Sequence, residues 1–247
     1  MGIRGGLRVN KREQMPKILS VFVLLFGALC LYIPSVCGMK AEAEATEPCA
    51  SRSVSAEDAV ERTREIVKEA VNTSFPELRK YSIRIKTMRK EATYFETRFS
   101  ISRYLAFRGL RIIMSVNPCV FELGAPLDGI RAIIAHELGH ADYYRRKNFF
   151  QLVSLVRLVN GDSSVNFERK TDLVAIERGY GDGLIKYRKW LYQNIPQEKV
   201  APKRRSYFTP EEIALLIPAM ASRPELRGKL SRKVPRNIAE LQRALER

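Results

Sequence analysis

The 247-residue sequence predicts an α+β fold in which helix dominates and a small antiparallel sheet lies early in the chain. Apolar and polar residues alternate over 81–88 and again over 110–116, which is typical of strands with one buried face. From residue 127 onward, apolar residues recur at helical spacing instead. The composition, with 45% hydrophobic and 28% charged residues, excludes collagen, wholesale disorder and a multi-span membrane protein.

The first 38 residues have the pattern of a secretory signal. Five basic residues precede residue 18, and residues 18–36 carry no charge. We expect either cleavage after Gly38 or retention as an inner-membrane anchor, since about 19 apolar residues can just span a bilayer. In both cases the rest of the chain is exported to the periplasm or secreted. We expect this exported part to consist of a linker at 39–54 and a single domain at 55–247.

The exported part is strongly basic. The chain carries a net charge of +16, and removing residues 1–38, with five basic residues and one acid, leaves +12. An exported protein rarely meets nucleic acid, so we expect no such partner. Peripheral contact with an anionic membrane or cell-wall polymer is one interpretation, and a merely solvated basic surface is the other. The cluster 145–147 precedes an apolar segment at 149–159, which we expect to be a helix that is buried beside the site or touches lipid.

Two cysteines, Cys49 and Cys119, remain if the signal is cleaved. In an oxidising compartment such a pair predicts one disulfide, which would join the N-terminal segment to the middle of the fold. Two free buried thiols are the alternative.

The first half of the exported chain contains the predicted sheet. A helix is expected over about 56–73, because Ser55 can cap it and Pro76 ends it. Strands follow at 81–88 and 110–116, and the aromatic-rich segment 94–107 can supply another.

The second half is expected to be helical. Asp128 can cap a helix that reaches about Tyr144, and a helix over 166–178 is stopped by Gly179. Asp182 can cap the next helix, Thr209 and Pro210 open a further one, and the last begins near Pro235.

The two histidines of the chain stand in the motif His136-Glu137-Leu138-Gly139-His140. Residues four apart lie on one face of a helix, so both imidazoles can bind a single Zn²⁺. Glu137 is then placed to take a proton from water activated by the metal. Gly139 weakens the helix by about 1 kcal/mol relative to Ala, and a close approach of another backbone would be one reason for it.

A catalytic zinc site needs a third protein ligand, which here must be a carboxylate because no other histidine exists. Asp142 would point away from the metal face. Glu168 and Asp172 lie one turn apart on the following helix, which suits a ligand and an acceptor for the second ring nitrogen of a histidine. Glu177 is expected on the surface of that helix.

The HExxH helix followed by an ExxxD helix resembles the gluzincin zinc metallopeptidases in their minimal-core form, of the bacterial cell envelope. The resemblance covers about residues 80–195 and leaves the last 50 or so residues unaccounted for. It implies that His136, His140 and Glu168 bind zinc, that Glu137 is the general base and that Asp172 supports a ligand. It also implies that residues 111–116 form the edge strand of the core, to which a substrate peptide adds.

The chain departs from the larger gluzincins in having no further histidine to stabilise an oxyanion. The remaining candidate donors are Tyr143, Tyr144, Arg178 and Tyr180. The resulting prediction is an exported zinc metalloendopeptidase that hydrolyses peptide bonds in a peptide or protein substrate. The alternatives are a zinc-binding envelope protein that acts as a binding module without catalysis, and a basic peripheral module whose zinc only stabilises the fold.

Overall fold

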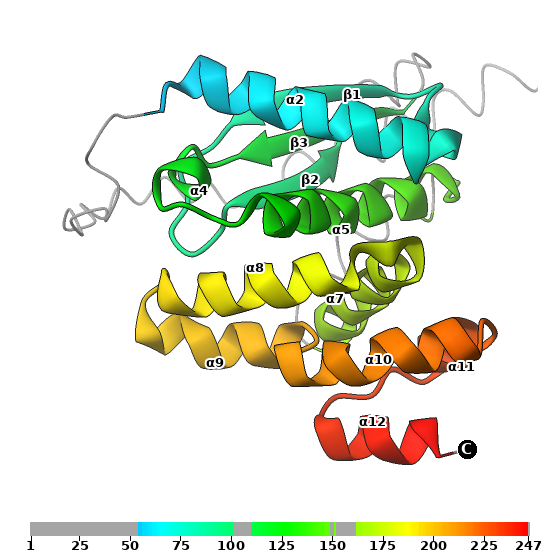
Figure 1. The fold of residues 1–247 in the computed structure, drawn as a ribbon. Helices are drawn as coiled ribbons and strands as arrows, with labels where there is room; N and C mark the ends of the chain where they lie inside the picture. Colours follow the sequence, from blue (N-terminus) through cyan, green and yellow to red (C-terminus); the bar gives the residue numbers. More distant parts are fainter. Residues whose placement is uncertain (1–53, 101–109, 149–150, 152–161, 247) are drawn as a thin grey trace, which may run out of the picture. The chain divides into compact units, whose positions relative to one another are not determined.

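The computed structural model describes residues 54–100, 110–148, 151 and 162–246. These residues belong to one compact unit, Thr46–Arg247. The predicted signal or anchor, the linker up to residue 53, Cys49 and nearly all of the apolar segment 149–159 lie outside the described residues. The predicted α+β class is confirmed, since helices surround a small three-stranded sheet (Figure 1).

The first described helix begins and ends where the sequence predicts. Helix α2 spans Ala56–Thr73, and the Ser55 hydroxyl accepts a hydrogen bond of 3.0 Å from the Asp58 N–H. The buried side of α2 packs on the sheet and on α5. A short 3₁₀ turn, η1 at Pro76–Leu78, follows it.

The sheet is mixed, so the prediction of an antiparallel sheet was wrong in this respect. Its strands are β1 (Ser82–Thr87), β2 (Phe95–Phe99) and β3 (Arg111–Val116), in the order β1-β3-β2. Strand β3 runs antiparallel to β2 and parallel to β1. The chain reverses direction between β1 and β2 and again between β2 and β3, so β3 runs parallel to β1. Strand β3 lies between the other two strands.

The expectation that residues 111–116 form an edge strand was also wrong. Strand β3 is central and pairs on both sides, while β1 and β2 are the edges of the sheet among the described strands. The predicted buried face of β3 is confirmed, because Ile112, Met114 and Val116 are fully buried. A central strand buried on one face anchors the sheet against the helices.

Helix α5 (Leu127–Arg145) lies between the sheet with α2 on one side and the later helices on the other (Figure 1). It follows the short helix α4 (Cys119–Glu122). Pro126 occupies its cap position, so Asp128 falls in the first turn, where it pairs with Lys186 instead of capping.

Two helices return alongside α5. Helix α7 spans Asp162–Ala175 and thus starts four residues before the predicted start; the π-helical turn η2 (Ile176–Tyr180) connects it to α8 (Gly181–Gln193). Gly179 adopts a φ of 87°, which explains why the helix breaks there. The residue at the cap position of α8 is Tyr180, and Asp182 lies in the first turn.

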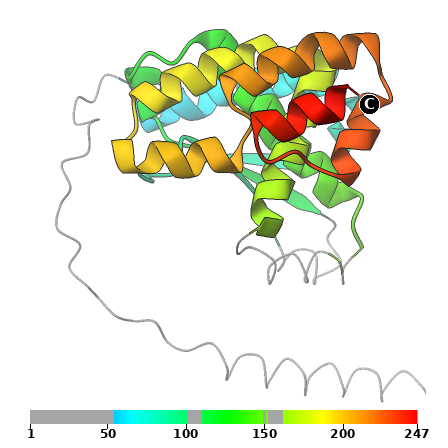
Figure 2. The ribbon, with the colours of Figure 1, turned by 90° about the horizontal axis from the view of Figure 1, so that it is seen from below.

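The last 50 residues form four helices: α9 (Gln197–Ser206), α10 (Pro210–Ser222), α11 (Leu226–Arg232) and α12 (Ile238–Leu245). The predicted start of α10 is confirmed, with a capping box between Thr209 and Glu212. Helix α9 escapes prediction because Pro202 interrupts it and none of its residues is buried. Figure 2 shows α12 beside α10. Among the described helices, none combines the length and apolarity needed to cross a bilayer.

Candidate metal centre

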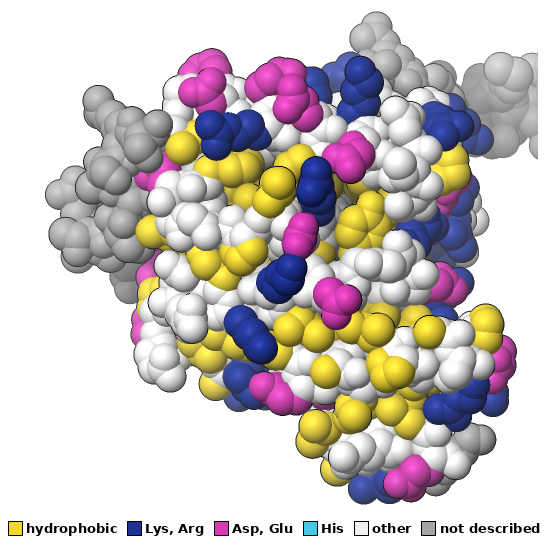
Figure 3. Space-filling model, viewed as in Figure 1, with side chains coloured by type: hydrophobic (Ala, Val, Ile, Leu, Met, Phe, Trp, Pro, Cys, Tyr) yellow, Lys and Arg dark blue, Asp and Glu magenta, His cyan; other side chains and the backbone are white. Residues whose placement is uncertain are grey.

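The middle of α5 carries the predicted motif into the interior. His136, Glu137 and His140 are only 1%, 6% and 5% exposed. One ligand atom from each lies within 4.8 Å of the others. Neither histidine is visible on the face seen in Figure 3.

Glu168 of α7 meets the two histidines, as predicted. Its Oε2 lies 3.1 Å from His136 Nε2 and 3.2 Å from His140 Nε2, and the two Nε2 atoms are 3.1 Å apart. Three ligand atoms from two helices therefore form a nearly equilateral triangle.

The spacing of the three ligand atoms fits a metal ion with tetrahedral coordination. Ligand atoms about 2.0–2.1 Å from a tetrahedral Zn²⁺ are about 3.3–3.4 Å from one another. The observed separations of 3.1–3.2 Å are close to this value. The set of two nitrogens and one carboxylate oxygen is also one that zinc accepts, with a fourth position left for a further ligand.

Hydrogen bonds on the far side of each ring determine which nitrogen is available. His136 Nδ1 lies 2.8 Å from Asp172 Oδ1, and His140 Nδ1 lies 3.3 Å from the Thr171 hydroxyl, which itself donates to the Phe167 carbonyl. Both Nδ1 atoms therefore act as donors, and in neutral rings both Nε2 lone pairs face Glu168. Lone pairs and a carboxylate at this distance repel unless a cation or a proton lies between them.

In the metal-free protein that role falls to a proton. Burial alone would lower the pKa of His136, but the charge of Asp172 and the hydrogen bonds to Asp172 and Glu168 raise the pKa to about 9. Burial raises the pKa of Glu168, but the two histidines outweigh it and hold that pKa well below its usual range. A bound metal ion would take the place of this proton.

Asp172 has a larger set of partners than predicted. The same Oδ1 that accepts from His136 accepts from the buried Arg188 at 3.1 Å, and Oδ2 accepts from the Phe208 N–H at 3.0 Å. Burial would raise the pKa of Asp172, but Arg188, His136 and the Phe208 amide lower it. Asp172 thus stays ionised and fixes the orientation of the His136 ring.

Glu137 does not join the triangle. Its Oε2 is buried and has no hydrogen-bond partner among the described residues. An unpaired buried carboxylate oxygen is costly, so its position calls for a ligand such as water or a substrate group. Glu168 is 21% exposed at its side chain, more than His136 at 1% or His140 at 7%.

Gly139 of α5 faces Thr171 and Val174 of α7. A Cβ at this position would lie 2.8 Å from the Thr171 Cγ2, well inside ordinary contact distance. The expected close neighbour of the glycine is therefore present, but it is the Thr171 side chain and not a backbone, so the expectation was wrong in this respect. The absence of a side chain lets Glu168 reach the histidines.

The four predicted oxyanion donors lie in two places. Arg178 donates to Glu77 and to the Ser74 carbonyl, and the Tyr180 hydroxyl pairs with Ser74, so both are engaged at the end of α2. Tyr143 and Tyr144 instead form an aromatic cluster beside His140, together with Phe99 and Phe167.

Asp142 and Glu177, which the sequence did not place among the metal ligands, form ion pairs with arginines. Asp142 pairs with Arg145 and Arg146, which also neutralises part of the basic cluster at 145–147. Glu177 pairs with Arg227 at the surface. Cys119 is disulfide-bonded, and since Cys30, Cys37 and Cys49 all precede residue 54, its partner lies outside the described residues. Pairing with Cys49 stays a prediction.

Sequence reasoning missed Arg188 and Tyr207. Arg188 lies four residues after Leu184 and three before Leu191, on the apolar face of α8. A basic residue within an apolar stripe was the available signal. Tyr207 lies between α9 and α10, where no local pattern indicates a site.

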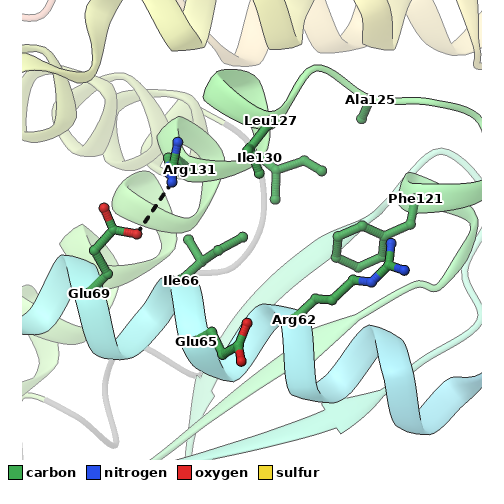
Figure 4. Close-up of a pocket in the computed structure, with 9 residues that line it drawn as sticks. All are labelled: Arg62, Glu65, Ile66, Glu69, Phe121, Ala125, Leu127, Ile130 and Arg131. Atoms are coloured by element: carbon green, nitrogen blue, oxygen red, sulfur yellow. Dashed lines mark ion pairs between the residues drawn. The ribbon is translucent and has the colours of Figure 1, made fainter.

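A separate groove of about 430 Å³ lies between α2 and the start of α5 (Figure 4). The apolar Ile66, Phe121 and Leu127 line it together with charged residues such as Arg62 and Glu65. None of the predicted site residues borders it.

Comparison with models of protein families, with curated proteins and with solved structures found no match. The functional conclusion therefore rests on the buried His136–Glu137–His140 group and its contacts.

Proposed function

We propose that this chain is a zinc-dependent endopeptidase of the minimal gluzincin type, which hydrolyses peptide bonds in peptide or protein substrates. The observation that best supports this proposal is the triangle of His136 Nε2, His140 Nε2 and Glu168 Oε2. A structural zinc site is closed by four protein ligands, whereas a catalytic site keeps one position open. The triangle supplies three ligands, and Glu137 stands beside it with an unpaired oxygen.

A zinc ion held by these residues would supply Lewis acidity, which lowers the pKa of a bound water toward about 7 and polarises a carbonyl group. Glu137 accepts the proton of the attacking water and returns it to the leaving amine. Asp172 and Thr171 keep protons on the Nδ1 atoms of His136 and His140, so that both Nε2 atoms remain ligands.

We assign substrate binding to the edge of β2. Within the described sheet β2 pairs only with β3, so its other edge can accept an extended peptide. The end of β2 lies beside α5, since the ring centroid of Phe99 is 5.0 Å from that of Tyr144. A peptide added there would run past His140.

The proposal includes export, which rests on the charge pattern of residues 1–38. Peripheral contact of the basic domain with anionic lipid or cell-wall polymer also belongs to the proposal.

The replacement Glu137→Gln tests the mechanism. It removes the base and spares the ligands, so zinc content should be unchanged while hydrolysis of an unfolded protein falls by about 10²–10⁴-fold. Glu177→Gln is the matched control, because it makes the same chemical change at a surface ion pair. Undiminished hydrolysis by Glu137→Gln would refute the assigned mechanism. A wild-type protein that holds zinc but cleaves nothing would instead favour the non-catalytic binding module.

A further inference from the structure

The segment between α9 and α10 is tied to the metal centre by its backbone. Asp172, which orients His136, accepts a hydrogen bond of 3.0 Å from the Phe208 N–H. The carboxylate that fixes a zinc ligand therefore also fixes the chain directly after Tyr207.

A second buried arginine holds the chain on the other side of Tyr207. Arg169, next to Glu168 on α7, is 1% exposed and donates through Nε to the Arg205 carbonyl at 3.3 Å. Its Nη1 donates to Glu212 at 3.1 Å. The backbone is thus held two residues before and one residue after Tyr207.

The ring of Tyr207 is also held in place. The Arg188 guanidinium lies 4.1 Å from its centroid, a cation–π contact, and the same Arg188 donates to Asp172. The Tyr207 and His136 ring centroids are 5.7 Å apart. Arg188 therefore places the tyrosine against a predicted zinc ligand.

The hydroxyl of Tyr207 is available as a donor. Within the part of the chain that the structure describes, it makes no hydrogen bond, and the side chain is only partly buried. A tyrosine hydroxyl carries one proton that it can donate to an acceptor oxygen. Among the four donors predicted earlier, Tyr144 is the main rival, but its ring packs in the aromatic cluster beside His140.

We propose that Tyr207 is a catalytic residue, whose hydroxyl donates a hydrogen bond to the scissile carbonyl oxygen as that oxygen gains negative charge. This inference rests on the proposed function. It assigns a role to the last 50 residues, since they bring the donor to the metal centre. Removing one such donor lowers kcat by about 10²–10³-fold in other hydrolases.

The test compares Tyr207→Phe with the control Tyr81→Phe, just before β1 and outside the site, in the full-length protein, and Tyr144→Phe is measured as the rival donor. Each change removes one hydroxyl and keeps the ring, so Arg188 can still stack on residue 207. A fluorescence-quenched peptide cut by the wild type gives kcat and KM. Calorimetry with a phosphinic peptide, which carries a tetrahedral anionic centre, provides a readout that does not depend on turnover. Metal analysis checks that zinc is retained.

Tyr207→Phe should lower kcat by about 10²–10³-fold and change KM little. It should also weaken the binding of the phosphinic peptide by a comparable factor. Tyr81→Phe should leave all three close to the wild type, and a loss confined to Tyr144→Phe would overturn the assignment to Tyr207. Full kcat and full phosphinic-peptide affinity in Tyr207→Phe would overturn the inference. If the wild type binds zinc but cleaves nothing, the proposed function fails, and the phosphinic-peptide affinities still decide whether Tyr207 reaches a bound oxyanion.

Discussion

Gly139→Ala is a sharp structural test of the site, because it adds one methyl group at the crossing of α5 and α7. The new Cβ would lie 2.8 Å from Thr171 Cγ2, whereas ordinary contacts start at 3.4 Å, so the two helices must separate by about 0.6 Å locally. Thr171 cannot easily turn away, since its hydroxyl bonds both His140 Nδ1 and the Phe167 carbonyl.

The separation should affect zinc binding more than stability. Overpacking of this kind costs about 1–3 kcal/mol, and the better helix propensity of alanine offsets about 1 kcal/mol of that. The same shift moves Glu168 away from the two histidines, and metal sites tolerate only about 0.5 Å of misplacement. We therefore expect zinc affinity to fall at least about tenfold.

Zinc titration by calorimetry and chemical unfolding measure the two effects. Gly228→Ala is the matched control, because a Cβ there meets only the end of Arg232 at 3.9 Å; it should leave zinc affinity unchanged. Thr171→Ser combined with Gly139→Ala removes the clashing methyl, keeps the hydroxyl and should restore binding. Wild-type zinc affinity in Gly139→Ala alone would refute the account of the helix crossing.

Two further predictions concern the groups around His136. Its pKa of about 9 in the metal-free protein is raised above the unfolded value, so it stabilises the fold fully below about pH 6.5, and this contribution is lost as pH rises through 9. Zinc displaces that proton, so affinity should rise by about tenfold per pH unit from pH 7 to 9 with release of about one proton; calorimetry in two buffers checks this, and a flat profile would contradict it. Asp172→Ala should weaken zinc binding by about 10–100-fold. It also leaves Arg188 buried without its partner and should lower the unfolding free energy by about 3–5 kcal/mol, part of which Arg188→Met should recover; unchanged unfolding in urea would contradict this.

The elements with local signals were predicted well. Helices α2 and α10 begin directly after their N-cap residues Ser55 and Thr209, and such caps can be recognised from a few neighbouring residues. Strand order was not predictable in the same way, because the insertion of β3 between β1 and β2 depends on pairing between distant segments. The choice of edge strand failed for that reason.

The site residues likewise differ in whether a local sequence pattern indicates them. The four-residue spacing of His136 and His140 and the turn between Glu168 and Asp172 are local, and the structure brings all four together. The contribution of Tyr207 depends on how α9 and α10 pack against α7, and no short pattern encodes that packing. Arg178 and Tyr180 were candidate oxyanion donors because the sequence holds no further histidine for that role. In the structure both contact Ser74 at the end of α2, more than 100 residues earlier, and the local sequence does not indicate such a contact.

The central claim is that one zinc ion is held by His136, His140 and Glu168. Metal analysis of the purified protein, combined with zinc absorption spectroscopy, tests it most directly. We predict one zinc per chain with nitrogen and oxygen ligands only, lost in His136→Ala, His140→Ala and Glu168→Ala and kept in Glu177→Ala. Full zinc occupancy in Glu168→Ala, or sulfur among the ligands, would contradict the claim.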